Sequence, residues 1–283
     1  MHRYLCLFLI SVLISSTTPA QAAKSDTGYD RVIKTQTLRC GYGTWEPGVY
    51  KDPKTGKMTG LFVDLINEIG RLSKIQIEWT AEIDWGQIVE AIRSGKIDAF
   101  CAGMTNDAVR GKYLAYSHPL SYWTFDVLVR AEDNRFPQSG IVLIGDLNKK
   151  EYKTAYSEGD VLETIAINEF PLVKGVPLPP MGTPADNLMN VLTKKTDFVV
   201  FPKVMFQGYS KTNPGKLRYL KVEPPLRRYG NVIAMGIDDL RLQQLVNAGV
   251  IELVNSGAYH TIMQKYDIDY PGAFIPASST TTK

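Results

Sequence analysis

The sequence predicts an α/β protein of two doubly wound, parallel-sheet lobes, joined by two extended hinge crossovers, with a ligand cleft between the lobes. Strand-like and helical segments alternate at 37–102 and again at 152–201, an order typical of parallel sheets covered by helices. Two long extended runs, at 122–130 and 229–235, lie before and after the second unit. Because open parallel sheets bind ligands beyond the carboxyl ends of their strands, two facing sheets place the ligand between them.

The first lobe is expected at 29–121 and, after the chain returns, at 231–272. Its predicted elements are a strand at 37–42, a hairpin-like loop at 50–60, a helix at 61–72, a strand at 75–79, a helix at 85–94 and a strand at 97–102. Apolar residues at helical spacing predict the helices, and alternation of apolar and polar residues predicts the strand at 75–79. Gly95 ends the second helix.

The second lobe is expected at 122–230. Its predicted elements are a strand at 152–156, a helix at 161–170, a proline-rich loop at 171–184, a helix at 185–192 and a strand at 197–201. The returning chain adds helices at 239–254 and 259–265 to the first lobe. The residues from 273 to 283 are mostly small and polar, which predicts a disordered tail.

The first 22 residues have the three regions of a signal peptide. Arg3 gives a positive start, residues 5–14 are apolar, and residues 15–22 end in the A-x-A pattern of Ala20-Gln21-Ala22. The apolar run is too short for a stable membrane-spanning helix, which argues against the alternative of a membrane anchor. We therefore expect residues 1–22 to be cleaved and the mature protein to be periplasmic.

Composition argues against several classes of function. The chain is 44% hydrophobic and 22% charged, with a net charge of +3 and no block of basic residues, so no nucleic-acid partner is expected. The three histidines and three cysteines are scattered without metal-ligand spacing, so no metal or other cofactor is expected. We expect a monomer.

Cys40 and Cys101 remain after cleavage, in an oxidising compartment. Both lie in strand-like segments, and they could form a disulfide if those strands are neighbours. The alternative is a pair of buried thiols that act as small apolar residues. The sequence slightly favours the thiols, because a disulfide between adjacent parallel strands is geometrically demanding.

The segment DAFCAGMTNDAVRGK, at 98–112, has the features of an anion site. A buried strand ends at Ala102 and Gly103, and Thr105 and Arg110 follow within a few residues. A guanidinium offers a carboxylate two parallel hydrogen bonds, and a glycine lets backbone N–H groups approach closely. A helix starting after the strand would add further donors. Alternatively, Arg110 is a surface residue that pairs with a neighbour.

Four segments resemble one known family: LRCGYGTWEPGVY, KMTGLFVDLINEIG, WGQIVEAIRSGKIDAFCAGMTNDAVR and YLAYSHPLSY. In number, order and spacing they are similar to motifs of the extracytoplasmic solute-binding proteins of the polar-amino-acid type. The resemblance covers most of 38–122, continues weakly, and returns at 229–266. It implies the two-lobed fold of type II periplasmic binding proteins.

The resemblance also implies a ligand site. It places Gly103, Thr105 and Arg110 on the ligand carboxylate, and Trp45 on an aromatic position that stacks on the ligand. Trp85 could form a second wall, although both tryptophans could instead fill the core. The full set of expected ligand-binding residues is Trp45, Trp85, Ala102, Gly103, Thr105, Arg110, Ser157 and Asp160.

The sequence departs from the family pattern at positions of the second lobe that would determine which ligand binds. Family members that bind α-amino acids usually carry an aspartate after the last strand of the second lobe, and here Pro202 stands there. The usual G-T-T segment is replaced by Gly159-Asp160-Val161. Asp160 either caps the following helix or contacts the ligand, where it would oppose an anion or receive an amine. Asp107 could orient Arg110 or partly neutralise it.

These features predict a periplasmic binding protein that captures a small carboxylate-bearing solute, amino-acid-like or otherwise, by lobe closure and delivers it to the permease of an ABC transporter. One alternative is an enzyme on the same scaffold, similar to the cyclohexadienyl dehydratases, for which Asp160 is the candidate acid. Another is a sensory or accessory module of a periplasmic system. The sequence shows no catalytic motif, so no enzyme is expected.

Overall fold

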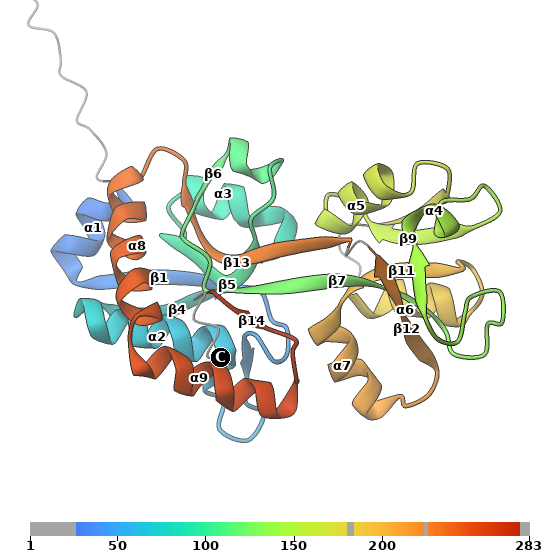
Figure 1. Cartoon of the computed structure of the whole chain (residues 1–283). Coiled ribbons are helices and arrows are strands. Elements are labelled where there is room, and N and C mark those ends of the chain that lie inside the picture. Colours follow the sequence, from blue (N-terminus) through green and yellow to red (C-terminus); the bar gives the residue numbers. More distant parts are fainter. Residues whose placement is uncertain (1–26, 180–183, 224–225, 278–283) are drawn as a thin grey trace, which may run out of the picture.

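A computed structural model describes residues 27–179, 184–223 and 226–277 of the chain. The expected signal peptide at 1–22 lies outside the described residues. Figure 1 shows two α/β halves side by side, with strands β7 (Ser121–Arg130) and β13 (Arg227–Gly236) running between them. These strands are the two extended runs of the sequence, so the predicted two-lobed architecture is confirmed. The boundaries assigned to each lobe remain a prediction.

The strands form a sheet in the order β10-β9-β11-β7-β13-β5-β1-β4. The first half contains β1 (Thr37–Tyr42), β4 (Gln76–Glu82), β5 (Ala99–Thr105) and β6 (Leu114–Tyr116), with a hairpin of β2 (Tyr50–Lys51) and β3 (Met58–Thr59). The second half contains β8 (Ile141–Leu143), β9 (Lys153–Ser157), β10 (Lys174–Leu178), β11 (Phe198–Pro202) and β12 (Leu217–Glu223). Strand β1 is parallel to β4 and β5, and β9 is parallel to β10 and β11, as alternation with helices predicts.

The helices cover the sheets of each half. Around the first half lie α1 (Gly28–Thr35), α2 (Leu61–Ser73), α3 (Ile88–Arg93), α8 (Leu240–Val254) and α9 (Gly257–Asp269), and around the second lie α4 (Ile144–Leu147), α5 (Val161–Glu169), α6 (Pro184–Leu192) and α7 (Lys203–Thr212). Helix α2 buries a continuous apolar face against the sheet and packs on α8. No helix in the described ranges is long and apolar enough to cross a membrane.

Some elements differ from the sequence prediction. Residues 171–184, expected as a loop, contain β10, which carries Pro177 at the edge of the sheet, where a missing N–H costs no ladder bond. Helix α7 directly follows β11 and was not predicted, because its apolar residues do not form a long periodic stripe.

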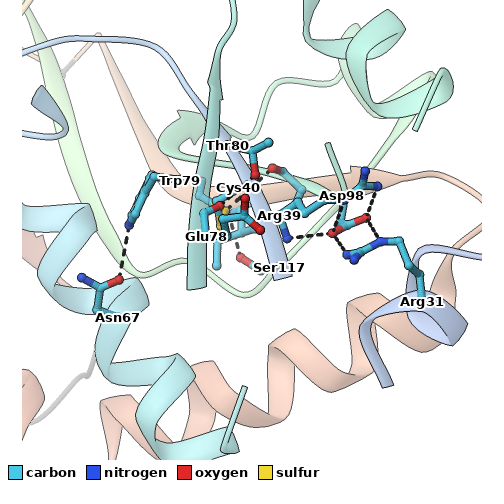
Figure 2. The surroundings of a disulfide bond; sticks show 12 residues. Arg31, Arg39, Cys40, Asn67, Glu78, Trp79, Thr80, Asp98 and Ser117 are labelled. Carbon is cyan, nitrogen blue, oxygen red and sulfur yellow. Dashed lines mark hydrogen bonds and ion pairs between the residues drawn. A yellow bond between two sulfur atoms is a disulfide. The ribbon is translucent and has the colours of Figure 1, made fainter. Parts of the chain in front are cut away.

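The expectation of two free thiols is wrong: Cys40 of β1 and Cys101 of β5 form a disulfide, with their Cα atoms 5.5 Å apart. The two strands are hydrogen-bonded neighbours, which brings the two side chains within bonding distance. Beside the bond, Arg31 and Arg39 both converge on the buried carboxylate of Asp98 (Figure 2). The first part of β5, at the beginning of the segment 98–112, is therefore fixed covalently and by charge.

The chain from 273 onward is ordered at its start, contrary to the expected disordered tail. Strand β14 (Ile275–Pro276) pairs with β7 at Tyr122 and Ser121. The ring of Phe274 is buried and lies 6.3 Å from that of Trp45. An aromatic side chain that fills the core anchors the segment, while residues 278–283 lie outside the described ranges.

The same C-terminal segment also touches the second half. The carbonyl of Pro271 accepts a hydrogen bond from Gln207 of α7 at 3.1 Å, and the Lys211 ammonium lies 3.8 Å from the ring centre of Tyr270. Since Tyr270 follows α9, the two halves meet at this contact as well as through β7 and β13. Any relative movement of the halves must accommodate it.

Replacing both cysteines, by Cys40→Ala with Cys101→Ala, should lower the free energy of unfolding by about 2–4 kcal/mol, because the crosslink closes a long loop in the unfolded chain. Urea titration followed by circular dichroism measures the change. Adding a reductant to the wild type should give a similar loss, and adding it to the double variant should give none. Equal stability of the variant and the oxidised wild type would contradict the role assigned to the bond.

Candidate functional site

A cavity of about 570 Å³ lies between the two halves. This volume is in the range of small-molecule sites. Its walls come from the start of α3, the end of β5 with the turn after it, the hinge strand β7, the β9–α5 loop and the β11–α7 junction. The cavity therefore lies beyond the carboxyl ends of β5, β9 and β11, where the fold class predicts it.

Gly103 and Thr105 line the cavity at the end of β5. Gly103 has a φ of +69°, and a Cβ atom there would lie 2.3 Å from the Phe62 ring. Only glycine meets both requirements without strain. Asn231 of β13 donates to the Gly103 carbonyl at 3.2 Å and accepts a hydrogen bond from Ser121 at 2.9 Å, so both hinge strands hold this end of β5 in place.

Arg110 lines the cavity and reaches the opposite half, where its guanidinium donates to the carbonyl of Gly159 at 3.2 Å. Asp107 holds the base of this side chain. One carboxylate oxygen accepts the backbone N–H of Arg110 at 2.9 Å, and the other lies 3.6 Å from Nε. The expected helix after the strand is a single 3₁₀ turn, Arg110–Lys112, so it adds little helix dipole.

The β9–α5 loop brings Ser157, Glu158, Gly159 and Asp160 to the second wall. Asp160 is the N-cap of α5 and accepts the N–H of Leu162 at 3.1 Å, which confirms the capping interpretation. Burial raises the pKa of the Asp160 carboxyl, while the Leu162 hydrogen bond and the Arg110 charge lower it and the charge of Asp107 raises it further. Asp160 therefore both caps a helix and faces the cavity.

Aromatic side chains form much of the remaining wall. Trp85 lies on the cavity and packs edge-on against Phe100, with ring centres 5.3 Å apart. Trp123 and Phe125 of β7 form part of the lining, and neither was singled out as a site residue in the sequence. Their signal in the sequence was a pair of aromatic residues two positions apart in an extended run, which places 123 and 125 on one face of the hinge strand.

Trp45 and Ala102 lie behind the cavity wall and are absent from its lining. The indole of Trp45 is 7% exposed and donates to the Ala102 carbonyl at 2.9 Å. Its ring packs against those of Phe62 and Trp123, with the Trp123 ring centre 5.4 Å away. The structure thus places Trp45 where it supports Trp123, because the folded-back tail and β7 cover the position expected for ligand stacking.

The β11–α7 junction presents an apolar surface to the ligand. Phe201, Pro202 and Met205 line the cavity there, and Pro202 is buried. Asn187 of α6 also lies in the wall, where its amide donates to Ser157 at 3.1 Å and its carbonyl oxygen has no hydrogen-bond partner. No sequence pattern marked Asn187, since its place depends on how α6 packs. Within the described ranges no cluster of side chains could hold a metal ion.

The fold and the interlobe cavity together define a class of protein, the two-lobed solute-binding proteins. Residues 38–268 match the family described as bacterial extracellular solute-binding proteins, family 3, and the chain belongs to this family. A probable histidine-binding protein of Campylobacter jejuni is 22% identical over 275 residues, which cover 95% of this chain and all of the relative. A probable ABC transporter extracellular-binding protein of Bacillus subtilis is 27% identical over 143 residues, half of this chain and 48% of the relative.

Solved structures show the same fold. An ancestral amino acid-binding protein, described as a precursor of cyclohexadienyl dehydratase, superposes with a TM-score of 0.69 at 23% identity, over 85% of this chain and 99% of that one. Holo ArgBP from T. maritima superposes with a TM-score of 0.65 at 21% identity, over 84% and 99%. The solved structures therefore agree with the two-lobed fold, and the family is one of extracellular solute-binding proteins.

Gly103→Ala should destabilise the protein by more than Gly95→Ala, a matched control. Both glycines have nearly the same positive φ, +69° and +70°, but the control has open space where a Cβ would lie. We expect the control to lower the free energy of unfolding by about 1–2 kcal/mol through backbone strain. Gly103→Ala should lower it by at least about 1 kcal/mol more, because the new Cβ clashes with Phe62. Equal losses in urea titrations of the two variants would show that close packing does not constrain Gly103.

Proposed function

We propose that the mature chain, released by cleavage after residue 22, is a periplasmic binding protein that captures a small carboxylate-bearing solute by lobe closure. The contact that carries this proposal is the hydrogen bond between Arg110 and the Gly159 carbonyl, which joins the two walls of the cavity. A guanidinium has five N–H donors in a planar fork, so it can contact Gly159 and still grip a carboxylate. Gly103 and Thr105 complete the first wall.

Closure follows from the same geometry. A ligand that touches Thr105 on one wall and Ser157 on the other makes both sets of contacts only when the halves are together, so it shifts the population toward the closed form. The closed shape would then be recognised by the permease of an ABC transporter. We propose a monomer that needs no partner subunit to form the cavity, since all its walls come from one chain.

Binding without catalysis is the function that the cavity supports best. A dehydratase on this scaffold would need a positioned acid, whereas the named relatives of this chain are binding proteins. The nuclear magnetic resonance spectrum of a ligand incubated with the protein should therefore stay unchanged, because the ligand is bound and not converted. New resonances that vanish in the Asp160→Asn variant would instead favour the enzyme.

A thermal-shift screen of the mature protein against amino acids, amines, organic acids and sugars should identify a ligand that raises the melting temperature. Small-angle scattering should then show a smaller radius of gyration with that ligand. A ligand that binds without any change in the radius of gyration would contradict capture by closure.

Arg110→Ala should weaken binding of that ligand by about 1.5–3 kcal/mol, because the variant leaves the carboxylate without its charged donor. Titration calorimetry measures the loss, and Arg93→Ala on the exposed surface of α3 is the control for removing a positive charge from the same half. Arg110→Lys should recover part of the affinity, since an ammonium keeps the charge but loses the fork. Unchanged affinity of Arg110→Ala would remove this residue from the site.

A further inference from the structure

The cavity lining has more acidic than basic side chains. Among the described lining residues, Arg110 is cationic, whereas Glu158 and Asp160 are acidic. Asp107, just behind the wall, adds a further carboxylate close to Arg110. A ligand that carried only a carboxylate would therefore leave the second wall without a partner of opposite charge, and a ligand that also carries a cation would satisfy both walls.

Three backbone carbonyls near Arg110 already accept a hydrogen bond. The carbonyl of Ala102 accepts from Trp45, that of Gly103 from Asn231, and that of Gly159 from Arg110 itself. At the end of β11, Pro202 offers neither a charged side chain nor an N–H group. Among the described lining residues, the side chains that could give an ammonium group a full opposite charge are Glu158 and Asp160, both in the β9–α5 loop.

We propose that Asp160 receives the ammonium group of an α-amino acid whose carboxylate is held by Arg110. This inference rests on the proposed function and names the chemical class of the solute. The two charges of an α-amino acid lie on one carbon atom, so their partners must be close together. Arg110 meets this condition because it contacts Gly159, the residue before Asp160.

The cap of α5 does not prevent this role. A carboxylate has about four lone-pair sites, and one hydrogen bond to Leu162 leaves acceptor capacity. The N-terminus of a helix carries roughly half a positive charge, which is less than the full negative charge of an ionised carboxylate at Asp160. The loop therefore presents net negative charge to the cavity, and Glu158 increases it. For the same reason this helix end is a poor site for the ligand carboxylate.

The test uses three pairs of probes, L-phenylalanine, L-histidine and L-arginine, each beside its desamino analogue, which lacks only the α-ammonium group. Titration calorimetry compares the wild type with Asp160→Asn, a variant that removes the charge and keeps a good capping residue. Glu151→Gln removes an exposed negative charge from the same half, away from the cavity, and controls for net charge. Glu158→Gln tests the competing assignment. Melting temperatures of the unliganded variants report on folding.

For at least one pair, the amino acid should bind the wild type at least about tenfold more tightly than its desamino analogue. Asp160→Asn should lower the affinity for the amino acid by about tenfold or more without lowering the affinity for the desamino analogue. Glu151→Gln should change neither affinity. The proposal is overturned if Asp160→Asn leaves the affinity for the amino acid unchanged or lowers the affinity for both members of a pair equally. It is overturned as well if Glu158→Gln lowers the affinity for the amino acid and Asp160→Asn does not. It is also overturned if the desamino analogue binds more tightly.

The failure of this inference is distinguishable from failure of the proposed function. If no amino acid binds but a ligand of another class closes the lobes, the role of Asp160 is wrong and capture by closure stands. If no ligand of any class closes the lobes, both are wrong.

Discussion

The hydrogen bond from Arg110 to the carbonyl of Gly159 joins the two halves of the protein at the cavity, and the account of its function depends on it. Asp107 fixes the backbone of Arg110, and Asp160, next to the accepting carbonyl, fixes the start of α5. A fixed cation on one wall and a fixed anion on the other, in a cavity lined largely by aromatic and apolar side chains, can distinguish small solutes by charge as well as by shape.

The rest of the first half holds that cation in place. The disulfide and the Asp98 ion pairs secure the start of β5, and Asn231 secures its end at Gly103. The aromatic residues Trp123 and Phe125 of β7 line the cavity, and Trp45 packs against Trp123. Because the hinge strand itself carries Trp123 and Phe125, a ligand that contacts them also touches the element about which the halves would move.

The sequence predicted the parts of the fold that depend on local pattern. Alternation of helices and strands predicted the two lobes. Glycine with arginine after a buried strand predicted an anion site, which stays a prediction. The sequence left the Cys40–Cys101 disulfide as the less favoured alternative and did not mark Asn187, because both depend on which strands and helices become neighbours. Trp45 looked like a ligand contact from its place in a motif. The structure places it behind the wall, because Phe274 and β7 enclose it, and no local pattern reports that the tail folds back.

A crystal structure of the mature protein with the ligand that most raises its melting temperature tests the central claim directly. The account predicts a carboxylate within hydrogen-bonding distance of the Arg110 guanidinium, in a closed cavity between the two halves, with the α-amino nitrogen on the side of Asp160. A ligand bound elsewhere, or an Arg110 side chain turned into bulk solvent while the cavity is occupied, would contradict it.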